Sequence, residues 1–145
     1  MKAFHFCENK MAYTNVNPRK AARRHLAAAN VLDRQSGPGD QPGCRAVAGY
    51  LYGIAGELAV KQMMLNIGLD PSEPAFYKHF PELKSMLSTV RGPHARELRR
   101  IADNSALFQH WHTKMRYVHT SEIQDGWVDK WKKSAEDLIN QMEAV

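Results

Sequence analysis

The segment that most limits the fold is residues 44–67, which read CRAVAGYLYGIAGELAVKQMMLNI and are followed by Gly68. It is apolar on most sides, so it predicts one long central helix that ends at the glycine. Its interior glycines each cost about 1 kcal/mol of helix propensity, which close packing must offset. Small residues that would permit close packing recur along it: Ala46, Ala48, Gly49, Gly53, Ala55, Gly56 and Ala59. The Gly- and Ala-rich face of residues 46–59 also suggests the contact of a two-fold dimer.

The other long segments show helical periodicity, and none alternates as a strand would. Asn17 and Pro18 are typical of a helix start, because Asn caps free N–H groups and Pro fits the first turn. The predicted helices besides the central one are 18–34, 82–90, 94–107 and 121–145. The last carries the clearest apolar stripe, formed by Trp127, Trp131, Ala135, Leu138 and Met142. The sequence therefore predicts an all-α fold, an antiparallel bundle of about five helices.

The chain of 145 residues has the length of one domain. We expect residues 1–16 to form an N-terminal extension and 17–145 a single helical domain, with a flexible Gly- and Pro-rich loop at 36–43. No run approaches the ~20 apolar residues of a membrane helix, and the first ten residues do not resemble a secretory signal. Cys7 and Cys44 are too few and too far apart for a disulfide scaffold. These features predict a cytoplasmic protein without membrane contact.

The net charge of +5 is unevenly distributed along the chain. Residues 18–25 hold four bases and no acid, and residues 91–100 hold Arg91, Arg96, Arg99 and Arg100 against a single acid. Acids prevail from residue 121 onward. An anionic partner, with nucleic acid first among the candidates, fits the basic segments. The alternative is a set of solvated helix faces without a partner.

The strongest candidates for chemistry are Arg116 and His119, with Lys114 beside them. If the segment is helical, Arg116 and His119 share a face. Arg offers a fork of donors to a phosphate and His moves a proton near neutral pH, which together would support metal-free cleavage of RNA. In the alternative interpretation, Arg116 pairs with Glu57 or an acid of the last helix, and His119 is a surface residue. The pairs His110–His112 and His5–Cys7 lack further ligands, so the sequence predicts neither a metal site nor a cofactor.

The order of these features resembles the HEPN family of helical bundles from about residue 17 to 142. Three groups of residues carry the resemblance: Tyr50, Leu51 and the run 56–61 (GELAVK); His79, Pro81, Glu82, Leu83 and Leu87; and Trp111, Arg116 and Tyr117. The resemblance implies a bundle that dimerises. In many members, Arg and His separated by four to six residues meet across the dimer axis as a ribonuclease site. Such members act as toxins or defence proteins, often with a nucleotidyltransferase-type antitoxin.

This chain departs from the family motif at the proposed site. Arg116 and His119 have two residues between them, whereas Lys114 and His119 have four, and Arg19 and His25 in the first helix have five. Two functions therefore stay open. The first is a metal-independent endoribonuclease that uses Arg116, His119 and Lys114. The second is a non-catalytic HEPN-like module that binds RNA, a nucleotide or a partner protein and dimerises.

Overall fold

The computed structural model describes residues 15–35 and 44–144, and all regular secondary structure in these ranges is helical. The predicted extension 1–16, except its last two residues, and the predicted loop 36–43 lie outside them. The α-helices in the described residues are α2 (Pro18–Arg34), α3 (Cys44–Asn66), α4 (Glu82–Leu87), α5 (Arg96–Asp103) and α6 (Asp125–Glu143). Short 3₁₀ helices are η1 (Pro74–Tyr77), η2 (Thr113–Arg116) and η3 (Thr120–Glu122). The predicted all-α bundle is thus confirmed, and none of the helices in the described ranges is long and apolar enough to cross a bilayer.

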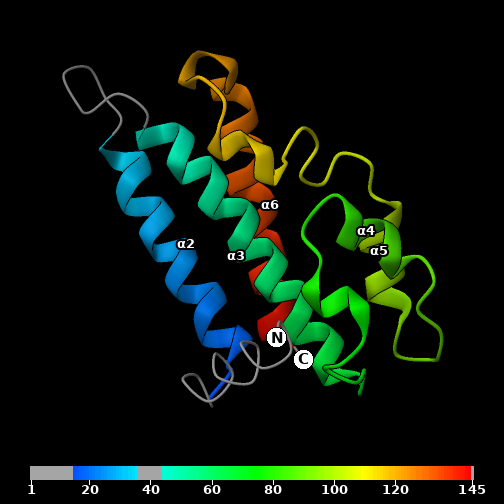
Figure 1. Ribbon diagram of the computed structural model, residues 1–145. Helices are drawn as coiled ribbons and strands as arrows, with labels where there is room; N and C mark the ends of the chain where they lie inside the picture. The colour runs from blue at the N-terminus through cyan, green and yellow to red at the C-terminus, as the bar shows by residue number, and fades with distance from the viewer. Residues whose placement is uncertain (1–14, 36–43, 145) are drawn as a thin grey trace, which may run out of the picture.

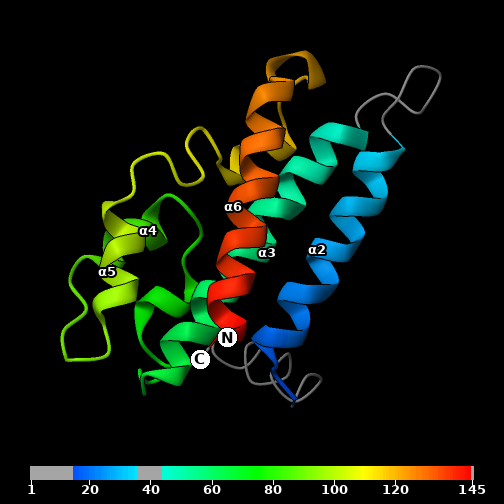
Figure 2. The same ribbon diagram turned by 180° about the vertical axis from the view of Figure 1, so that it is seen from behind.

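Helix α3 lies in the middle of the bundle, packed along α2 on one side and α6 on the other (Figures 1 and 2). Arg45, at the start of α3, forms ion pairs with Asp33 at the end of α2 and with Asp125 and Asp129 at the start of α6. α2 therefore runs antiparallel to α3, as predicted, whereas α3 and α6 run parallel, so the predicted antiparallel arrangement does not hold for this second pair. The long connection 67–124, which includes α4 and α5, returns the chain to the end where α3 began (Figure 1).

The glycines of α3 make room for aromatic rings of the same chain. A Cβ atom at Gly53 would lie 2.0 Å from Cε2 and Nε1 of Trp111, and one at Gly56 would lie 2.5 Å from the Phe108 ring. A Cβ atom at Gly49 would lie 2.9 Å from Trp131. These positions were predicted to permit close approach, and they do. The approaching groups are intramolecular, however, so these glycines do not support the expected dimer contact, and the dimer stays a prediction.

Local side-chain bonds account for the helix ends. Asn17 Oδ1 accepts the Lys20 N–H at 3.0 Å, and α2 begins and ends where predicted. The predicted helix 82–90 is shorter, because Ser88 and Thr89 donate their hydroxyls to carbonyls three residues back. The predicted helix 94–107 ends at Asp103, because Asn104 is extended and its Oδ1 accepts the N–H of Ala106. The predicted helix 121–145 begins only at Asp125, because η3 precedes it.

The segment after α5 turns sharply and carries two aromatic rings into the core. Phe108 and His110 have positive φ angles of 52° and 71°, a left-handed conformation that non-glycine residues seldom adopt. Trp111 is buried, and its Nε1 donates to the Gly49 carbonyl at 3.1 Å. Tyr50 stacks on Trp111 with ring centroids 5.5 Å apart. This packing fixes the position of residues 112–119, which follow directly.

Candidate functional site

Residues 112–122 form two 3₁₀ turns, and a histidine side chain begins each. His112 Nδ1 accepts the backbone N–H of Lys114 at 3.0 Å and opens η2. His119 Nδ1 accepts the backbone N–H of Ser121 at 3.1 Å and opens η3. The expectation that Arg116 and His119 share one helical face was therefore wrong. The side chains of both residues, and that of Lys114, are nonetheless exposed on one short segment.

The guanidinium of Arg116 lies over two aromatic rings. Its Cζ is 5.9 Å from the ring centroid of Tyr50 and 5.3 Å from that of Tyr117, within the range of cation–π attraction. Its Nε donates to the Thr113 carbonyl at 3.2 Å. Within residues 15–35 and 44–144 no carboxylate pairs with it, so the alternative in which Arg116 pairs with Glu57 or with an acid of α6 was wrong.

A groove of about 510 Å³ separates this segment from the start of α3. Its lining is mainly apolar and includes Val47, Tyr50, Met115, Arg116 and Val118. Tyr117 is 81% exposed beside it. An apolar groove with an unpaired guanidinium at its edge can take a flat ring inside and an anion at the rim.

Glu57 lies in the core, and its carboxylate contacts the side chains of Lys61 and His79. The residue is 4% exposed, and its Oε2 accepts from Lys61 Nζ at 3.0 Å. Its Oε1 lies 2.7 Å from Nδ1 of His79, whose side chain is 53% exposed. A carboxylate only accepts, so His79 Nδ1 carries a hydrogen and the neutral ring has its lone pair on Nε2. This orientation is the one that prepares a histidine to take up a proton.

Sequence reasoning did not assign a role to this cluster. Glu57 and Lys61 lie four residues apart in an otherwise apolar helix. Because buried charges are normally paired, this spacing could have indicated a buried ion pair. The contact between Glu57 and His79 joins residues 22 apart in the chain, so it depends on the tertiary fold.

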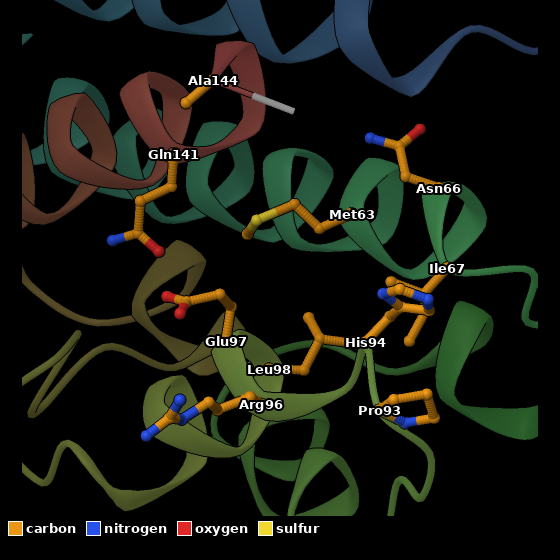
Figure 3. Close-up of a pocket in the computed structure, with 10 residues that line it drawn as sticks. All are labelled: Met63, Asn66, Ile67, Pro93, His94, Arg96, Glu97, Leu98, Gln141 and Ala144. Carbon is orange, nitrogen blue, oxygen red and sulfur yellow. The ribbon is translucent and has the colours of Figure 1, made fainter.

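The arginines around α5 fall into two groups. Arg99 donates to the Val90 carbonyl at 3.1 Å, and Arg100 pairs with Glu97 at 3.1 Å. Arg91 and Arg96 are exposed and have no acidic partner in the described part of the chain. Arg96 borders a hollow of about 650 Å³ between the end of α3, the start of α5 and the end of α6. In Figure 3 the side chains of Met63, Glu97 and Gln141 converge on that hollow.

The basic run of α2 is partly neutralised within the molecule. Arg19 and Arg23 both pair with Glu143 near the end of α6. Lys20 and Arg24 are exposed and pair with no acid among the described residues. Among the described residues, exposed cations without an acidic partner thus lie on the 113–119 segment, at Arg91 and Arg96, on the outer face of α2 and at Lys130 of α6.

The remaining histidines do not assemble a metal site. His110 stacks on Trp127 at a centroid distance of 4.6 Å, while His112 faces its own 3₁₀ turn. In the two described ranges no group of three His, Cys, Asp or Glu side chains lies close enough to hold a metal ion. Nearby, the ammonium of Lys84 donates to the Leu107 carbonyl, and burial lowers the pKa of this lysine.

No protein-family model matches the chain, and comparisons with curated proteins and with solved structures found no match. The similarity to the HEPN family thus stays a prediction that rests on the residues named above. The function must be argued from the geometry of the chain itself.

Proposed function

We propose that this protein binds single-stranded RNA at the surface formed by Tyr50, Lys114, Arg116, Tyr117 and His119, called here the Arg116 platform. The observation that supports it is the exposed guanidinium held over two tyrosine rings with no carboxylate partner in the described ranges. Keeping a cation unpaired and oriented is useful when its partner is an external anion.

The platform combines the two contacts that single strands use. The exposed ring of Tyr117 and the apolar groove offer stacking surfaces for bases, worth about 1–3 kcal/mol per base. The Arg116 guanidinium can hold a phosphate with two parallel hydrogen bonds, and Lys114 adds a point charge. His119 presents Nε2 outward with a hydrogen attached, because its Nδ1 accepts from Ser121. Arg91 and Arg96 supply further phosphate contacts for a longer strand.

Fluorescence anisotropy with a labelled, unstructured RNA of twelve nucleotides tests this proposal. A charge-assisted hydrogen bond is worth about 1.5–3 kcal/mol, so Arg116→Ala should weaken binding at least about tenfold. Arg116→Lys should bind with intermediate affinity, because it keeps the charge and loses the planar fork. Arg24→Ala is the matched control, since it removes an exposed arginine of α2 that is not part of the platform, and it should change affinity little. Equal losses from Arg116→Ala and Arg24→Ala would contradict a specific role for the platform.

The second candidate is cleavage of RNA without a metal by Arg116 and His119, assisted by Lys114. It is favoured by one observation, the outward Nε2–H of His119 three residues from an unpaired arginine. Following the HEPN resemblance, the site would form from two copies of a cytoplasmic toxin or defence protein, restrained by a nucleotidyltransferase-type antitoxin. In excess chelator the wild-type protein would then cut RNA. His119→Asn, which keeps an acceptor for the Ser121 N–H, would not.

A further inference from the structure

A second hollow, of about 210 Å³, lies between the start of α4 and the start of η2. Two histidines from distant parts of the chain line it, His79 and His112, together with the ion pair of Lys78 and Glu82. Pockets that enclose a whole small molecule usually exceed ~300 Å³, so this one fits a fragment of a polymer better. A single phosphodiester linkage with its ribose is a fragment of that kind.

The two histidines are fixed with opposite hydrogen-bonding roles. His79 Nδ1 donates to buried Glu57, so its exposed Nε2 carries the lone pair and can accept a proton. His112 Nδ1 accepts the Lys114 N–H, so in the neutral ring Nε2 carries the hydrogen and donates. The two histidines that line the hollow are therefore one proton acceptor and one hydrogen-bond donor. Each is held in its tautomer by a partner outside the hollow.

This pairing is poorly suited to a metal ion. A metal ligand must offer a lone pair, and His112 can offer Nε2 only if it gives up the bond from Lys114 or loses its last ring hydrogen. His79 alone cannot hold a metal, and in the described part of the chain no third ligand joins the two. The arrangement favours proton transfer.

The hollow adjoins the Arg116 platform. His112 opens η2 and Arg116 closes it, so with a 3₁₀ rise of about 2.0 Å per residue their Cα atoms are about 8 Å apart along the turn. The aromatic rings behind them are continuous, since Trp111 stacks on Tyr50 and meets Phe80, the neighbour of His79, edge-on at 6.4 Å. A short single strand bound to Arg116 can therefore reach the hollow.

We propose that the hollow between His79 and His112 is a catalytic site for RNA cleavage, an inference that rests on the proposed RNA binding. His79 Nε2 takes the proton of a ribose 2′-hydroxyl as its oxygen attacks the adjacent phosphorus. The bond from phosphorus to the 5′-oxygen breaks, that oxygen takes a proton from water, and His79 returns its proton to solvent. His112 Nε2–H donates to a phosphate oxygen while charge builds on it. The products are a 2′,3′-cyclic phosphate and a 5′-hydroxyl.

The test incubates the full chain with 5′-labelled, unstructured RNA in excess chelator, and measures binding separately by anisotropy. His79→Asn keeps an N–H that can donate to Glu57 but removes Nε2, so cleavage should fall at least about 100-fold. His112→Asn keeps an acceptor for Lys114 but removes the outward donor, and should also cost at least about 100-fold. Both variants keep the Arg116 platform, so RNA binding should weaken far less than cleavage does. His94→Ala, an exposed histidine outside the hollow, should cut normally, and an all-2′-deoxy strand should stay intact.

Three results would overturn the inference. The first is intact RNA after long incubation with wild-type protein that binds it, which would leave RNA binding standing without catalysis. The second is cleavage that survives His79→Asn and His112→Asn but is lost in His119→Asn, which would place the chemistry on the platform. The third is cleavage of the 2′-deoxy strand, which would exclude attack by the 2′-hydroxyl. Loss of RNA binding in the wild-type protein would instead contradict the proposed function itself.

Discussion

Glu143 joins the beginning of α2 to the end of α6 through Arg19 and Arg23. The hydrogen bonds from Arg23 hold the pKa of the Glu143 carboxyl below its usual range. A carboxyl whose pKa is lower in the folded protein adds stability above its unfolded pKa, and that stability is lost as the pH falls through the folded pKa. Glu143→Gln should therefore lower Tm at neutral pH, with the difference from wild type shrinking to nothing in acid.

Thermal unfolding monitored by circular dichroism from pH 7 to below pH ~3 measures this difference. Glu136→Gln is the control, because Glu136 is exposed on the same helix and makes no ion pair within the described ranges. If Glu143→Gln lowered Tm by the same amount at every pH, the carboxylate charge would not be what joins the two helices.

For single residues, residue type made Arg116 and His119 candidates for the site, but it did not predict their geometry. Two short turns replace the single helix that the sequence suggested. They form because the backbone N–H groups of Lys114 and Ser121 donate to His112 and His119. Such local bonds compete with helix formation and leave no periodic pattern in the sequence. Glu57 and His79 meet only through the tertiary fold.

The glycines of α3 lower its helix propensity, but the packing of the helix against Trp111 depends on them. Alanine at Gly53 would gain about 1 kcal/mol of helix propensity, but its Cβ would lie 2.0 Å from the buried Trp111 ring. We expect Gly53→Ala to destabilise the protein by more than about 2 kcal/mol, because the ring also donates to Gly49 and cannot shift freely. Urea unfolding measures the change.

Gly126→Ala is the matched control for this prediction. Gly126 lies in the first turn of α6 with nothing within 4 Å of an added Cβ, so alanine should leave stability unchanged or raise it by up to about 1 kcal/mol. If Gly53→Ala proved as harmless as Gly126→Ala, Trp111 would not be fixed against α3 as described.

The long helices were largely readable from sequence, since Asn17 and Pro18 mark the start of α2 and Gly68 follows the end of α3. The apolar stripe of α6 was also correct in its centre, where Trp131, Ala135 and Leu138 are buried. The ends of α4, α5 and α6 were not readable, because side chains of Ser88, Asn104 and His119 bind nearby backbone groups there.

At the scale of the whole molecule, periodicity identified the fold class but not the directions of the helices. The parallel α3–α6 pair follows from a connection of nearly sixty residues, within which α4 and α5 pack beside the bundle (Figure 2). Arg45 connects the three helix ends, and hydrogen bonds with Asp129, Asp125 and Asp33 raise its pKa against the effect of burial. No local pattern encodes such a contact across the bundle.

We expect the protein to form a homodimer, an expectation that comes mainly from the HEPN resemblance. The glycines of α3 no longer support it, because the chain's own rings cover them. Exposed apolar side chains support a dimer contact instead, since Val47 and Val118 line the groove beside the platform. Sedimentation equilibrium at micromolar concentration should give twice the chain mass, and a monomer would exclude any site composed from two copies.

The central claim is that Arg116 contacts a phosphate of a bound single strand, and the salt dependence of binding tests it most directly. Each phosphate contact on a single strand contributes about −0.7 to the slope of log K against log salt concentration. Arg116→Ala should make the slope shallower by about 0.7, while Arg24→Ala should leave it unchanged. If Arg116→Ala had the same slope as the wild type, the claim that Arg116 contacts a phosphate would be contradicted.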